Sequence, residues 1–122
     1  VSAKQMDWFK GKLDEALAKK ETTVIMCHYP THKPFNGHSL FNAGEMLALL
    51  DQYPNVVLWL NGHKHSGDYK MVGKRHHLNL KGMQEEDDHW YQLDFTPEKV
   101  TVFQAENVET PVFELDISWS KP

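Results

Sequence analysis

Two short runs of almost uninterrupted apolar residues, Thr22–Cys27 and Val56–Leu60, constrain the fold of this chain most. Runs of this length are typical of strands that are buried on both faces of a sheet. A helical pattern separates them: Asn42 can act as its N-cap, and apolar residues recur from Met46 to Leu50 before Pro54. A strand, a helix and a strand in this order predict two parallel neighbours joined by a right-handed crossover.

The rest of the chain extends this pattern on both sides. Ser2 and Gln5 form a capping-box pattern for a first helix, which we expect to end near Lys20. After Gly62 we predict short antiparallel strands at 69–72, 76–80, 90–95, 100–104 and 112–117, with tight turns between them. The predicted class is therefore α/β, in the order α-β-α-β followed by antiparallel strands. Its 122 residues fit a single domain or a fragment of one, and because it begins with Val1 we expect the natural N-terminus to lie upstream.

Composition excludes several classes of protein. Thirteen Lys and Arg against seventeen Asp and Glu give a net charge of −4, which disfavours nucleic-acid binding through phosphate neutralisation. No apolar run approaches the ~18 residues of a membrane span. The single cysteine, Cys27, excludes an intrachain disulfide framework and is expected to be a small buried apolar residue. The four tryptophans are expected to serve in packing: Trp8, Trp59, Trp90 and Trp119.

Histidines stand where both predicted parallel strands end. His28 follows the first strand, and His63 and His65 follow the second, just after Gly62. The carboxyl ends of parallel neighbours lie side by side, and this is where open α/β sheets bind ligands. Residues two apart in an extended segment point to the same side, so both later imidazoles can face one centre. Three imidazoles gathered there predict a site for a divalent metal such as zinc, manganese or iron.

The other histidines leave alternatives open. His32 and His38 lie in a long loop, Tyr29–Phe41, and are compatible with a site role or with a plain surface position. His76 and His77 are adjacent in a strand, so at most one of them can face the site. His89 follows four acidic residues at 85–88 and is expected to lie in a solvated turn.

Two sequence blocks carry a resemblance to a known family. The run Val24–Pro30, an apolar strand that ends in His-x-Pro, and the run Asn61–His65, which contains Gly-His-x-His, resemble the calcineurin-like metallophosphoesterases. The continuation through 66–69, 76–78 and 82–85 is similar to the manganese-dependent ADP-ribose/CDP-alcohol diphosphatase branch. The resemblance covers roughly residues 1–90.

The resemblance implies a fold and a metal site. It implies that the chain is the C-terminal half of an αββα sandwich that holds two divalent metal ions, with manganese favoured and iron or zinc as alternatives. His28 and His63 would share one ion and His65 would bind the other, with no catalytic residue in the chain beyond these ligands. A metal-bound hydroxide would attack the phosphorus of a phosphorylated small molecule, which could be a nucleotide. Substrate contacts are expected at Tyr69, His77 and Met83.

The chain also departs from the family pattern. The Asp-x-His, Gly-Asp-x-x-Asp and Gly-Asn-His blocks that supply the remaining ligands are not found ahead of His28. Without a bridging carboxylate, two neighbouring dications repel each other, so we expect the isolated chain to hydrolyse phosphate esters weakly or not at all. The alternative is a non-catalytic metal-binding or interaction module that pairs with an N-terminal half, or with itself, through an exposed sheet edge. The sequence gives no indication of localisation.

Overall fold

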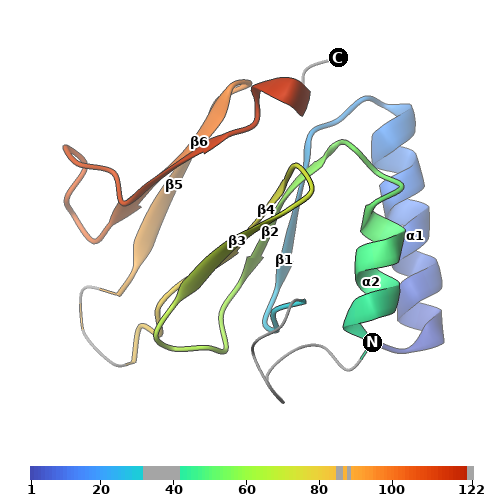
Figure 1. The fold of residues 1–122 in the computed structure, drawn as a ribbon, viewed down its shortest axis with the longest axis horizontal. Helices are drawn as coiled ribbons and strands as arrows, with labels where there is room; N and C mark the ends of the chain where they lie inside the picture. Colours follow the sequence, from blue (N-terminus) through green and yellow to red (C-terminus); the bar gives the residue numbers. More distant parts are fainter. Residues whose placement is uncertain (32–41, 85–86, 88, 121–122) are drawn as a thin grey trace.

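The computed structural model describes residues 1–31, 42–84, 87 and 89–120. In chain order the elements are α1 (Ala3–Ala18), β1 (Thr23–Cys27), α2 (Ala43–Leu50), β2 (Val56–Asn61), β3 (Asp68–Val72), β4 (Arg75–Asn79), β5 (Tyr91–Phe95), β6 (Lys99–Gln104), β7 (Phe113–Asp116) and a 3₁₀ turn at Ser118–Ser120. They form three layers: α1 and α2 lie side by side on one face of a first sheet, and a second sheet covers its other face (Figure 1). The predicted α/β class is thus confirmed. No helix in the described ranges is both long and apolar enough to cross a bilayer.

The first sheet has the strand order β1-β2-β4-β3, and the second has the order β5-β6-β7. β1 and β2 are parallel, as predicted from the strand–helix–strand order. β4 is also parallel to β2, whereas the sequence predicted only antiparallel strands after Gly62. The hairpin between β3 and β4 turns at Gly73 and Lys74, and Gly73 adopts a φ of 61°, a conformation that glycine tolerates without steric cost.

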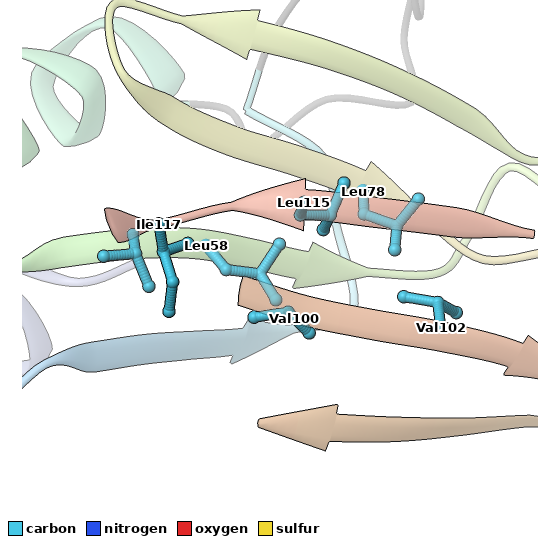
Figure 2. Packing of buried hydrophobic residues seen from close by; sticks show 7 residues of the cluster. Leu58, Leu78, Val100, Val102, Leu115 and Ile117 are labelled. Atoms are coloured by element: carbon cyan, nitrogen blue, oxygen red, sulfur yellow. The ribbon is translucent and has the colours of Figure 1, made fainter. Parts of the chain in front are cut away.

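Two apolar clusters hold the layers together. Between the helices and the first sheet the buried members are Leu13, Met46, Leu50, Tyr53, Val56 and Trp59. Between the two sheets they are Val57, Leu58, Leu78, Val100, Val102, Leu115 and Ile117, and Figure 2 shows this cluster with side chains from β2, β4, β6 and the region of β7. β2 contributes to both clusters, which explains why its residues are almost all buried. Burial of Trp59 confirms its predicted packing role.

β1 departs from the sequence prediction. It was expected to be buried on both faces, but among the described residues it is an edge strand whose one partner is β2, and Met26 is 79% exposed. An apolar run cannot distinguish a central strand from an edge strand, because the pattern does not report what covers it. Trp8 of α1 was expected to pack inside but is 65% exposed. Cys27 is only half-buried.

The helix termini match the predicted signals in part. Ser2 and Gln5 form both hydrogen bonds of a capping box at the start of α1, as predicted, and the helix ends at Ala18, close to the expected end near Lys20. Asn42 occupies the N-cap position of α2, but its side chain makes no capping bond. It bonds instead to Val1, with the side-chain amide donating to the Val1 carbonyl at 3.2 Å.

Candidate metal centre at the sheet rim

The carboxyl ends of β1 and β2 bring two histidines into direct contact. Cys27 and Asn61, the last residues of the two strands, are partners in the parallel register. His28 follows at once, and its carbonyl accepts a hydrogen bond from the Gly62 N–H at 3.2 Å. The Nε2 atom of His28 lies 3.1 Å from the Nδ1 atom of His63. The predicted meeting of these two imidazoles at one rim is therefore what the structure shows.

The backbone conformation that brings the imidazoles of His28 and His63 together differs from the expected one. Residues 62–65 are not extended, because His63 adopts a φ of 71° and the Lys64 N–H donates to the Gly62 carbonyl at 2.9 Å. The Gly67 N–H then donates to the Lys64 carbonyl at 3.0 Å. The extended conformation predicted for residues 63–65 is wrong, because a compact turn presents the imidazoles. We call residues Gly62–His65 the histidine turn.

His65 faces a segment that the sequence analysis did not connect with it. The Gly82 N–H donates to the His65 carbonyl at 2.8 Å, and the Gln84 side-chain nitrogen lies 3.2 Å from the His65 Nδ1. A Cβ atom at Gly82 would lie only 2.9 Å from the Cγ of His65, so glycine lets this segment lie directly on the ring. The carbonyl of Gly82 in turn lies 3.0 Å from the Nδ1 of His89. His89 is thus partly buried against the site, not simply in a solvated turn as expected.

A shallow cleft contains all three histidines. Its lining comes from the ends of β1 and β2, the histidine turn and the segment after β4, and includes His28, His63, His65, Met26, Lys81 and Met83. Met83 is exposed and lines the cleft, and its role as a substrate contact stays a prediction. Lys81 adds a cation to the lining, although sequence reasoning did not select it.

Tyr69 lies away from this cleft. It lines a separate cavity between the two sheets, its ring lies 5.7 Å from that of Phe113, and its hydroxyl lies 2.8 Å from the Nδ1 of His76. Burial raises the pKa of Tyr69 above its usual value. The Nε2 of His76 donates to the Asp116 carbonyl at 2.7 Å, so the two residues link the sheets. This position does not support the expected substrate contact at the histidine cleft, because the ring lies beside Phe113 of the second sheet.

His77 lies on the opposite face of β4 and is fully buried. Its ring is stacked near Trp59, with centroids 6.3 Å apart. The Nε of Arg75 donates to its Nε2 at 2.9 Å, and its Nδ1 lies 2.9 Å from the hydroxyl of Thr31. Burial lowers the pKa of Arg75, while Asp51 opposes that shift. A substrate contact at His77 is therefore not supported, although adjacent His76 and His77 do point to opposite faces, as predicted.

The contact between His28 and His63 fits a shared divalent ion. Two imidazole nitrogens bound at ~2.1 Å to one ion lie roughly 3.0–3.4 Å apart, depending on the coordination geometry. The observed 3.1 Å separation falls in this interval. Within 1–31, 42–84, 87 and 89–120, however, no group of three or more His, Cys, Asp or Glu side chains is arranged to hold a metal. The described residues thus supply a pair of ligands with His65 nearby, not a complete cage. His32 and His38 lie outside the described residues.

Comparisons with known proteins point to one class of enzyme. No family model matches the chain. It is 32% identical over 88 residues to the manganese-dependent ADP-ribose/CDP-alcohol diphosphatase of Xenopus laevis, which covers 70% of this chain and 25% of the relative. It is 34% identical over 68 residues to the 3′,5′-cyclic adenosine monophosphate phosphodiesterase CpdA of Escherichia coli K12, which covers 53% of this chain and 24% of that enzyme.

A solved structure has a similar fold. A dimetal phosphatase from Danio rerio superposes with a TM-score of 0.82 over 94% of this chain and 38% of its own, at 21% identity. The fold is thus that of part of a two-sheet α/β sandwich, with histidines at the ends of β1 and β2. The chain is a relative of the calcineurin-like metallophosphoesterases, as its two histidine blocks predicted. It spans about a quarter of the length of the curated relatives it matches.

Proposed function

We propose that this chain forms the C-terminal part of a phosphohydrolase that depends on two divalent metal ions and cleaves phosphate esters or nucleotide diphosphates. The observation that carries the proposal is the 3.1 Å approach of His28 Nε2 and His63 Nδ1 at the sheet rim. Its relatives support the chemistry, since one is named a manganese-dependent diphosphatase and a protein of the same fold is named a dimetal phosphatase. Manganese is accordingly the metal we favour.

The residues of the chain have separate roles in this proposal. His28 and His63 would hold one ion, and His65 would contribute to the second. Bound divalent ions would supply positive charge against the phosphate oxygens and lower the pKa of water. Lys81 and Met83 line the same cleft, so a cation and an apolar side chain are available to a phosphorylated substrate. We propose that Met83, not Tyr69 or His77, makes a substrate contact.

The chain alone is proposed to be inactive or weakly active. Its described residues contain no set of three or more ligating side chains around one point, and no carboxylate lines the cleft among them. Two adjacent dications repel strongly unless an anionic ligand lies between them. p-Nitrophenyl phosphate and ADP-ribose with added Mn²⁺ are the substrates to assay. Turnover by the isolated chain at rates typical of complete enzymes would contradict this part of the proposal.

Metal titration tests the ligand assignment directly. We expect Mn²⁺ to bind weakly to the unaltered chain in isothermal titration calorimetry, and His63→Ala to weaken that binding by at least about 10-fold. His76→Gln is the matched control, because it removes an imidazole that lies between the sheets and contacts the Asp116 carbonyl. Equal affinities for the unaltered chain and His63→Ala would show that the ligand assignment is wrong.

A second candidate function has a specific observation in its favour. β1 is an edge strand with Met26 79% exposed, and Trp8 on the neighbouring helix is 65% exposed. Unpaired strand edges flanked by apolar side chains pair readily with another strand. We therefore propose that the β1 edge can pair with a further segment of the sheet or with a second copy. Light scattering tests self-association: Met26→Lys should shift any dimer to monomer, and a monomeric unaltered chain would exclude the second copy.

A further inference from the structure

A pair of buried amides lies directly behind the histidine turn. Asn61 ends β2 and Asn79 ends β4, and the two are partners in the parallel register. They are 5% and 2% exposed, and the side-chain nitrogen of Asn61 donates to the side-chain oxygen of Asn79 at 2.6 Å. Buried amides of this kind persist where their hydrogen bonds specify a backbone conformation.

Asn79 holds the middle of the turn. Its Nδ2 donates to the carbonyl of Lys64 at 2.6 Å and to the carbonyl of Leu80 at 3.1 Å. The orientation of this amide follows from its partners, because backbone carbonyls only accept and so require the NH₂ group to face them. Lys64 stands between His63 and His65, so fixing its carbonyl restrains the backbone of both histidines.

Asn61 holds the start of the turn in the same way. Its Nδ2 donates to the Gly62 carbonyl at 3.0 Å as well as to Asn79, and its own backbone carbonyl accepts from the Leu80 N–H at 3.0 Å. Its side-chain oxygen is buried and has no hydrogen-bond partner among the described residues. The two bonds that Asn61 donates therefore tie the start of the turn both to its own backbone and to the end of β4.

We infer that Asn61 and Asn79 are positioning residues that hold the histidine turn in the conformation in which His63 meets His28. The turn needs such support, because a φ of 71° at His63 is unfavourable for a residue with a side chain. The link to metal binding rests on the proposed function, whereas the link to the turn conformation stands on the hydrogen bonds alone.

Asn79→Leu tests the inference, because leucine is similar in size and cannot donate to Lys64 or Leu80. In the metal-free chain we expect it to abolish the nuclear Overhauser contact between the His28 and His63 rings, whose centroids are 5.0 Å apart. We also expect Mn²⁺ affinity to fall about 10-fold. The matched control is Asn55→Leu, since Asn55 precedes β2, at its other end, and its amide also donates to a backbone carbonyl, that of Glu21 at 2.8 Å. The control should change neither readout.

Two further measurements keep the test decisive if Asn79→Leu does not fold. Asn79→Asp preserves the size and the acceptor for Asn61 but removes the donors, and it should lose the same ring contact. In the unaltered chain, the side-chain NH₂ protons of Asn79 should exchange slowly with solvent and show contacts to residue 64. Exchange at solvent rates, or an intact ring contact in a folded Asn79 variant, would overturn the inference. Absence of Mn²⁺ binding by the unaltered chain would instead count against the proposed function and leave the ring contact as the test of positioning.

Discussion

Replacing Gly82 by alanine should destabilise the fold and displace His65. The new Cβ atom would lie 2.9 Å from the Cγ, 3.0 Å from the Cβ and 3.1 Å from the Cδ2 of His65. Two of these atoms, the Cβ and Cγ, lie close to the backbone, so a small movement of the far end of the ring cannot relieve the overlap. To remove the steric overlap, either the backbone of residues 80–84 must shift or His65 must adopt another rotamer. The second change would also break the contact between His65 and Gln84.

The expected loss of stability in Gly82→Ala follows from the steric overlap between the new methyl group and His65. Inserting a methyl group into a well-packed contact costs about 1–3 kcal/mol. With an m-value of about 1.5 kcal/mol/M in urea, this corresponds to a midpoint lowered by roughly 0.7–2 M. The assay is urea unfolding followed by tryptophan fluorescence, combined with nuclear magnetic resonance of the His65 ring protons in the folded variant.

Gly11→Ala is the matched control, because it makes the same chemical change where a Cβ atom meets nothing within 4 Å. Gly11 lies inside α1, so alanine should stabilise the fold by about 0.5–1 kcal/mol through its better helix propensity. The same substitution therefore has opposite signs at the two positions. If Gly82→Ala leaves both the urea midpoint and the His65 resonances unchanged, the reasoning from close packing on that ring is refuted.

Two further predictions concern the helix-facing side of the first sheet. Arg75→Met should lower the free energy of unfolding by about 1–3 kcal/mol, because it removes the donor to the buried Nε2 of His77. Asp51→Asn, which alters the exposed partner of the same arginine, should cost less than about 1 kcal/mol in the same urea assay, and equal losses would contradict this assignment. Tyr53→Phe should raise the pKa of Asp14, because the tyrosine hydroxyl bond is the main cause that lowers it. Because the pKa of Asp14 is lower in the folded chain than in the unfolded chain, the free energy of unfolding falls as the pH drops through the folded pKa. This dependence on acid should be weaker in Tyr53→Phe. The pKa shift of Asp14 can be measured from its carboxyl carbon resonance.

The rim was predictable from the sequence because it depends on topology. An apolar strand, a helix and a second apolar strand imply parallel neighbours, and the residues that end such strands must meet. His28 and His63 follow from that rule alone. His65 was expected beside them, but the turn that carries it was not, since a left-handed residue at His63 leaves no pattern in the sequence.

The parts that were not predictable depend on contacts between distant segments. Tyr69 and His77 were expected near the site because they resemble family positions, yet β3 and β4 direct them between the sheets and toward Trp59. Gln84 and Asn79 gave no signal because their roles arise only once β4 lies parallel to β2. Likewise the apolar run of β1 could not report that Met26 would face an open edge.

His63 has a left-handed backbone conformation that favours glycine, yet the site uses its imidazole side chain. Glycine would adopt this φ with no Cβ conflict, whereas an L-residue pays about 1 kcal/mol or more. A search for variants that maximise thermal stability alone would therefore drift toward glycine at position 63 and discard the imidazole. Any consensus or computational redesign of this fold should hold that residue fixed, because glycine relieves the backbone strain at position 63 but removes the imidazole that faces His28.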